Sequence, residues 1–133
     1  DLSSAQLSIS GVDLVLENLV IALLAVNRFP LEKAYGLREG LRQQGLFNLV
    51  EVSTWRREKI YDALLASSYN RGSFLVGLIS DRVAALSRFV AGPEWSPLLT
   101  DFEAGFKGRV GKRLLGVSGI GPAVVENFWM LSS

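Results

Sequence analysis

Residues 114–125 read Leu-Leu-Gly-Val-Ser-Gly-Ile-Gly-Pro-Ala-Val-Val, and this stretch decides the fold of the chain. Apolar residues stand on both sides of a turn in which Gly119 and Gly121 are separated by one residue. Pro122 follows at once. Proline suits the first position of a helix because its fixed φ matches the helix and its missing N–H is not needed there. The stretch therefore predicts two helices joined by a tight turn.

The predicted turn is typical of a helix-hairpin-helix, a motif that binds nucleic-acid backbone. Gly119 and Gly121 can adopt backbone angles closed to other residues, and without side chains there the main chain can approach a ligand closely. The amides at the start of the second helix then face outward, where the peptide dipoles favour an anion such as phosphate. We predict that Gly119, Ile120 and Gly121 contact the backbone of duplex DNA.

Basic residues gather beside this turn. Residues 104–125 contain no Asp or Glu but hold four basic side chains, Lys107, Arg109, Lys112 and Arg113. Neutralising phosphates with such side chains releases counterions and gives salt-sensitive affinity. Lys112 and Arg113 are the candidate phosphate ligands, and the arginine suits bidentate bonds. The alternative is a glycine-rich link between two core helices, with the basic residues on a solvated face.

The composition fits one folded domain. The 133 residues are enough for one hydrophobic core and too few for two, so we expect a single helical domain over residues 1–133. Apolar residues make up 49% and charged residues 20%, which argues against disorder. The formal net charge is only +1, so attraction to a polyanion must come from local clustering of charge.

The residue types also exclude several kinds of chemistry. The sequence has neither Cys nor His, which removes disulfides, thiol nucleophiles, imidazole bases, the common zinc sites and cysteine-held iron–sulfur clusters. We expect no metal and no cofactor. The longest apolar run, Leu19 to Val26, is far shorter than the ~20 residues of a membrane span. Neither a membrane association nor a signal peptide is expected, and the absence of Cys is compatible with a cytoplasmic protein.

Apolar periodicity predicts helices along the whole chain after a polar start at residues 1–10. Ser53 or Thr54 is expected to cap the third helix, and Ser96 with Pro97 to open the fifth. No run alternates as a strand would. We therefore predict an all-α, compact bundle of about six or seven helices, ending in a helix-hairpin-helix at about residues 108–131. The preceding helices are expected at residues 12–26, 30–44, 53–65, 73–91 and 97–102.

This order of elements resembles the helix-hairpin-helix DNA glycosylase superfamily, in particular its endonuclease-type and adenine-mismatch members. The apolar helix over residues 19–27 is similar to the buried helix of that family, whose end presents an amide side chain to DNA; here that residue is Asn27. Residues 68–72 are similar to the tyrosine-asparagine turn of the family, which lies near the flipped base. The resemblance implies that Asn27 and Tyr69 contact DNA.

The chain departs from this family where the chemistry takes place. Bifunctional members form a Schiff base through a lysine just after the hairpin glycines, where this chain has Pro122 and Ala123. The resemblance implies a catalytic aspartate in the loop after the second hairpin helix, further along than Ser133. The cluster cysteines and the second helical domain of the family are missing as well. Three acids, Asp101, Glu103 and Glu126, are weak candidates to replace the aspartate.

Three functions follow from these observations. The first is a DNA-binding module of base excision repair that contacts backbone phosphate through the hairpin. The second is part of an active DNA N-glycosylase whose catalytic loop lies outside this chain. The third is a helical protein-interaction domain that binds no nucleic acid.

Overall fold

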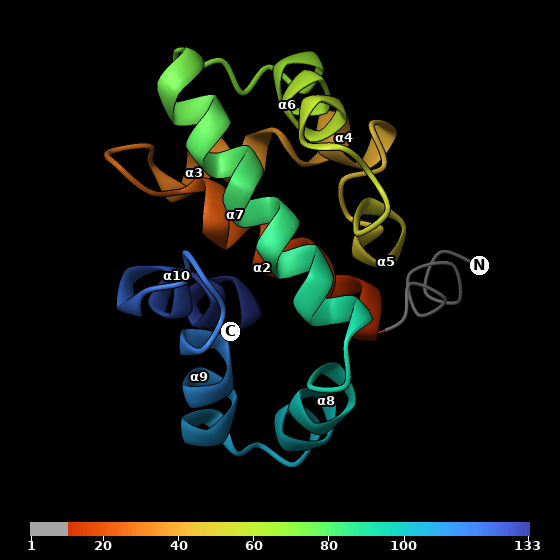
Figure 1. Ribbon diagram of the computed structural model, residues 1–133. Coiled ribbons are helices and arrows are strands. Elements are labelled where there is room, and N and C mark those ends of the chain that lie inside the picture. The colour runs from red at the N-terminus through yellow and green to blue at the C-terminus, as the bar shows by residue number, and fades with distance from the viewer. Residues whose placement is uncertain (1–10) are drawn as a thin grey trace, which may run out of the picture.

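The computed structural model describes residues 11–133, which fold into nine helices without a strand (Figure 1). The predicted all-α class is confirmed. The polar start predicted for residues 1–10 lies outside the described residues. The helices are α2 (Gly11–Leu24), α3 (Leu31–Gly36), α4 (Arg38–Gln43), α5 (Leu49–Val52), α6 (Arg57–Ala66), α7 (Ser73–Ala91), α8 (Trp95–Glu103), α9 (Lys107–Leu115) and α10 (Pro122–Ser132).

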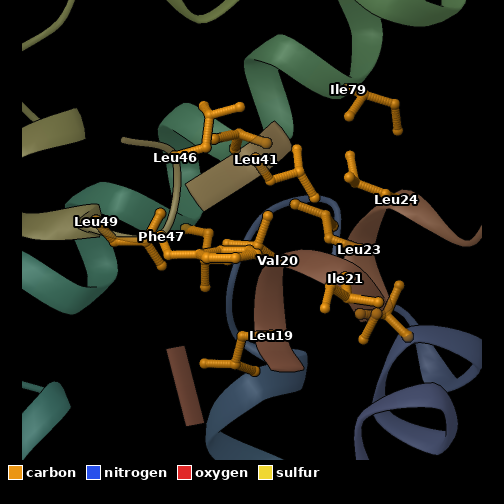
Figure 2. Packing of buried hydrophobic residues seen from close by; sticks show 14 of the residues in the cluster. Leu19, Val20, Ile21, Leu23, Leu24, Leu41, Leu46, Phe47, Leu49 and Ile79 are labelled. Atoms are coloured by element: carbon orange, nitrogen blue, oxygen red, sulfur yellow. The ribbon is translucent and has the colours of Figure 1, made fainter. Parts of the chain in front are cut away.

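Helix α2 lies at the centre of the fold, as its apolar second half predicts. All residues from Leu19 to Leu24 are buried, so this part of the helix is covered on every side. Its neighbours are α3, α7 and α10. Figure 2 shows Val20 and Leu23 of α2 among buried side chains from α4 and from the turn after it, such as Leu41 and Phe47.

Helix α7 is the second core element. It buries Val76, Ile79, Val83 and Leu86 completely, at the spacing of one helix face. Helices α5 and α6 pack against it. In Figure 1, α7 crosses in front of α2, with α4, α5 and α6 on one side of this pair and α9 and α10 on the other. The two long helices therefore form the middle of the fold, and α3, α5, α6, α8 and α10 pack directly against one or the other.

The helix predicted over residues 30–44 is divided into α3 and α4. Leu37 leaves the regular helix between them, and its N–H donates to Ala34 O, 3.1 Å away. Glycine in a helix costs about 1 kcal/mol relative to alanine, and Gly36 and Gly40 flank this break. The predicted end of this helix near residue 44 is confirmed: α4 ends at Gln43, and Gly45 follows with φ 77°.

Two predicted helix starts are wrong. The hydroxyls of Ser53 and Thr54 donate to Val50 O and Glu51 O in the turn that closes α5, and α6 begins only at Arg57. Both hydroxyls therefore donate hydrogen bonds to carbonyls of the preceding helix. Such local bonds of Ser and Thr compete with their role as N-caps of the next helix. Helix α8 begins at Trp95, before the predicted cap Ser96.

The predicted pair of helices around the glycine turn is confirmed as α9 and α10, and Pro122 is the first residue of α10. Val117 and Ile120 of the turn are buried, as are Val124 and Phe128 of α10. Helix α10 packs along α2. The hairpin is thus fixed to the central helix, and its turn has a defined place on the molecular surface.

None of the helices in residues 11–133 combines the length and the apolar character that crossing a lipid bilayer requires.

Candidate nucleic-acid interface

A groove of about 700 Å³ separates the hairpin turn from the loop between α2 and α3. Both the loop and α10 lie at the left of Figure 1. The groove thus joins two segments that are almost a hundred positions apart in the sequence. Its lining residues come from the loop, from α7 and from the start of α10, namely Ala25, Val26, Asn27, Arg28, Phe29, Pro30, Leu31, Arg82, Gly119, Gly121, Pro122, Ala123, Val124 and Asn127.

The loop wall of the groove has an unusual backbone. Asn27 and Arg28 have φ values of 54° and 70°, in a backbone region that residues other than glycine rarely adopt. Arg71 supports this conformation: its guanidinium donates to Val26 O at 2.6 Å and to Asn27 O. Both side chains on the strained residues are exposed. Strained backbone persists only where its surroundings enforce it, and it concentrates at functional sites.

Tyr69 holds the same loop from inside. Its side chain is completely buried, its hydroxyl donates to Leu24 O at 3.0 Å, and its ring meets Phe29 edge-on at 5.2 Å. Burial raises the pKa of the Tyr69 hydroxyl, which keeps it protonated as a donor. The ring has no open face for a base. The predicted contact of Tyr69 with DNA is therefore corrected to a role in positioning the loop.

The opposite wall carries backbone amides without acceptors. The N–H groups of Gly119, Gly121 and Ala123 have no hydrogen-bond acceptor in the part of the chain that the structure describes. Gly121 and Ala123 line the groove at the start of α10, an eleven-residue helix. The helix dipole adds positive potential at that end. These are the donors that an anion needs.

The surroundings of the two turn glycines, Gly119 and Gly121, differ in whether they require a glycine. Gly119 has φ 89°, and a Cβ there would lie 2.9 Å from Cδ of Arg82, so both its conformation and its packing require glycine. Gly121 has an extended backbone that any residue adopts (φ −106°), and a Cβ there would meet nothing within 4 Å. No contact within residues 11–133 explains the missing side chain at Gly121, which leaves the main chain open to the groove.

Asn127 joins the two walls. Its side-chain amide donates to Ala25 O at 2.9 Å and to Ala22 O at 3.3 Å, at the end of α2. Two carbonyls that the end of a helix leaves without partners are thereby satisfied. The start of α10 and the loop after α2 are held in a fixed relation, so the groove is preformed.

The groove is positively charged. Arg28 and Arg82 line it, and neither has an ion-pair partner among the described residues. The lining residues that the structure describes include no carboxylate. Two arginines, an exposed Asn27 and the free amides therefore face one hollow, and all of them can donate hydrogen bonds to phosphate oxygens.

The basic residues of α9 lie in a different environment. Arg113 donates to Asp101 at 2.9 Å and to Glu94 at 3.0 Å, and these carboxylates raise its pKa. Arg109 lies 3.8 Å from the same Asp101. Arg113 therefore holds α9 to α8, and its use as a phosphate ligand stays a prediction that these two ion pairs do not favour. Lys112 is exposed but does not line the groove.

Ile120 also has a structural task. Its side chain is 6% exposed, and its N–H donates to Val117 O at 3.1 Å. Ile120 therefore offers neither a free amide nor an accessible side chain for the predicted DNA contact. The residue anchors the turn in the core. Of the predicted site residues, the structure brings together Asn27, Gly119 and Gly121.

The candidate catalytic acids lie away from the groove. Asp101 is buried in its ion pairs with α9. Glu126 lines a separate hollow on α10, together with Trp129 and Met130. Glu103 is exposed at the end of α8. No three acidic side chains in residues 11–133 gather as the ligands of a metal ion would.

Arg28 and Arg82 are the groove residues that the sequence did not indicate. Arg28 follows Asn27 directly, so its neighbourhood was a signal, although a weak one. Arg82 lies in the middle of α7, and only the packing of Gly119 against its side chain places it at the hairpin.

A scan against protein-family models and searches of the curated proteins and of the solved structures found no match to this chain. The groove therefore has to be interpreted from its own chemistry.

Proposed function

We propose that this protein binds DNA through its backbone phosphates, with the groove between the hairpin and the α2–α3 loop as the binding site. One observation carries the proposal: unpartnered amides of the hairpin and two arginines without ion pairs line a single groove whose described residues include no carboxylate. Phosphate oxygens accept bonds from all these donors. This arrangement supplies affinity without reading the base sequence.

The open space at Gly121 supports a ligand that touches the main chain. At Gly121 neither the backbone conformation nor a contact within residues 11–133 requires a glycine. A phosphate at the start of α10 would use that space, because the amides of Gly121 and Ala123 have no acceptor among the described residues. In this proposal Arg28 and Arg82 take the next phosphates along the strand.

The proposal concerns binding and not catalysis. A glycosylase needs a carboxylate near the anomeric carbon of the extruded nucleotide, and the described lining residues offer none. Release of a base from duplexes with uracil, oxidised or alkylated bases tests the enzymatic alternative. Base release that is lost in Glu126→Gln would make the protein a glycosylase with an in-chain acid.

A fluorescence anisotropy titration with a short labelled duplex, at a low and a high salt concentration, tests the proposal. We expect binding at low salt that weakens as salt rises, because phosphate neutralisation releases counterions. Absence of binding at low salt would reject the proposal and leave the protein-interaction function.

The chain offers a matched control for this titration. Arg56 and Arg88 are exposed, have no ion pair in residues 11–133 and lie outside the groove. The double variant Arg56→Gln/Arg88→Gln removes the same charge as a change of both groove arginines. We expect it to bind the duplex nearly as tightly as the wild type.

A further inference from the structure

Helix α10 is apolar on two opposite faces, and the fold covers only one of them. Val124 and Phe128 are buried where α10 packs along α2. Val125, Trp129 and Met130 lie on the other side of the helix, where they line a hollow of about 520 Å³ that α10 shares with α9. A surface helix normally carries polar residues on its outward side. Helix α10 therefore has the composition of a helix that is covered on both sides.

The apolar residues around this hollow form one exposed surface, which we call the outer face. They are Leu115 of α9 and Pro122, Val125, Trp129 and Met130 of α10. Leu115 is 48% and Met130 60% exposed. Contiguous exposed apolar side chains with polar residues at their rim indicate a contact surface for another molecule. The outer face has this character on the side of α10 that points away from α2.

Two opposite charges border the outer face. Lys107, at the start of α9, and Glu126, in the middle of α10, both line the hollow, and both are exposed. Neither has an ion-pair partner in residues 11–133. The Nζ of Lys107 lies over the ring of Trp129, 5.1 Å from its centre, and so beside the last turn of α10. The outer face thus combines apolar side chains with one positive and one negative group that the fold leaves without an ion pair.

These features fit a second copy of the same chain. In an interface with two-fold symmetry, residue i of one copy contacts residue j of the other and j contacts i, so the surface has to complement itself. A surface with one lysine and one glutamate does so, because Lys107 of each copy can face Glu126 of the other. The formal net charge of +1 causes almost no repulsion between two copies. Phosphate, in contrast, would meet a carboxylate here.

We propose that the protein forms a symmetric homodimer through the outer face, in which Lys107 of each copy pairs with Glu126 of the other. The apolar side chains of the two outer faces bury one another, and the two symmetric ion pairs fix how the copies are oriented. This dimer does not require DNA binding, because the groove and the hollow on the outer face share only Pro122.

Sedimentation equilibrium of the full chain without DNA, at low salt and over a range of protein concentrations, tests the dimer. The apparent mass is expected to rise from 14.5 kDa towards twice that value as the concentration increases. Lys107→Glu and Glu126→Lys each place two pairs of like charges in the interface. Each variant is expected to weaken dimerisation by about 10-fold or more.

A mixture of these two charge variants distinguishes a lost ion pair from any other damage. In a heterodimer of Lys107→Glu with Glu126→Lys, each contact again joins a lysine and a glutamate. The mixture is therefore expected to dimerise nearly as tightly as the wild type, whereas each variant alone stays largely monomeric. Both substitutions change exposed side chains, so the fold is expected to persist.

Met130→Asp tests the apolar part of the outer face. It places a charge where the dimer buries an apolar side chain, and it is expected to be monomeric over the same concentrations. Val50→Asp is the matched control, because Val50 is 55% exposed and lies on α5, on the other side of the α2–α7 pair (Figure 1). This control is expected to dimerise as the wild type does.

A wild type that stays at 14.5 kDa at every concentration would overturn the dimer. Charge variants or a Met130→Asp variant that dimerise like the wild type would show that the copies do not meet through the outer face. A mixture of Lys107→Glu and Glu126→Lys that remains monomeric would overturn the pairing of these two residues across the interface. DNA binding is measured separately and does not depend on any of these outcomes.

Discussion

The arginines of the groove and the arginines of α9 lie close to the same hairpin, yet they differ in what surrounds them. Arg109 and Arg113 face Asp101, and Arg113 also bonds Glu94, so their charge is compensated within the fold. Arg28 and Arg82 have no ion-pair partner in residues 11–133 and line a groove. Only the second pair retains its charge for a ligand.

This difference indicates which basic residues of a nearly neutral protein keep a charge that a ligand can use. A run of basic residues in the sequence indicates a polyanion site only if no acidic side chain folds against it. Here Glu94, just before α8, and Asp101, within α8, pair with Arg113 of α9, and both precede the basic run in the chain. The density of basic residues in the sequence therefore does not show which of them keep an unpaired charge, because that depends on the carboxylates that the fold places beside them.

The largest effect on DNA affinity is expected from Arg28→Gln/Arg82→Gln. Hydrogen bonds to charged groups contribute about 1.5 kcal/mol or more each, so the loss of two weakens binding on the order of 100-fold. Anisotropy titrations at one fixed salt concentration measure it. A loss of affinity no greater than that of the control Arg56→Gln/Arg88→Gln would show that the groove is not the DNA-binding site.

Gly121→Val is expected to have the next largest effect, a loss of about 10-fold, because its side chain fills the space through which a phosphate reaches the amides. Its melting temperature is expected to stay near that of Gly121→Ala, whose Cβ meets nothing within 4 Å. Gly119→Ala provides the contrast. It is expected to lower the melting temperature, because φ there is 89° and Arg82 occupies the space. Full affinity in a well-folded Gly121→Val would contradict the main-chain contact.

Arg71→Met tests whether the strained loop has to be held in place. The change removes the bonds to Val26 O and Asn27 O, and we expect the free energy of unfolding to fall by about 2 kcal/mol. DNA affinity is expected to fall by about 3-fold, since Arg28 is no longer presented in one orientation. Denaturant unfolding and anisotropy measure the two effects separately. Unchanged affinity with reduced stability would limit Arg71 to a structural task.

Arg113→Gln is expected to have the smallest effect on binding. It breaks the contacts with Asp101 and Glu94, so thermal stability falls. DNA affinity should stay within about 2-fold of the wild type, because Arg113 does not line the groove and shares no ion-pair partner with Arg28 or Arg82. A loss as large as that of the groove variant would reverse the comparison between the two pairs of arginines.

The sequence predicted the helical hairpin and the central helix, because local signals determine both. Glycine spacing and Pro122 marked the turn, and the apolar residues of Leu19 to Leu24 marked a buried helix. The helix starts near Ser53 and Ser96 were mispredicted, since several nearby residues suit a cap and packing selects among them. Burial of Tyr69 and Ile120 was likewise decided by tertiary packing.

The walls of the groove could be predicted only in part. Asn27 and the turn glycines stand in recognisable motifs, but that they face each other depends on how α10 packs along α2. Whether Arg82 has an ion-pair partner depends on which acidic side chains the fold brings near it. Sequence patterns within one segment carry no information about such distances.

Amide chemical shifts of the 15N-labelled protein during titration with a short duplex test the central claim most directly. Phosphate binding in the groove predicts that the amides of Gly121 and Ala123 shift first and furthest, together with the loop at Asn27 and Arg28. Amides within α9 should move little. Shifts confined to α9, with the amides of Gly121 and Ala123 unchanged at saturation, would contradict the account.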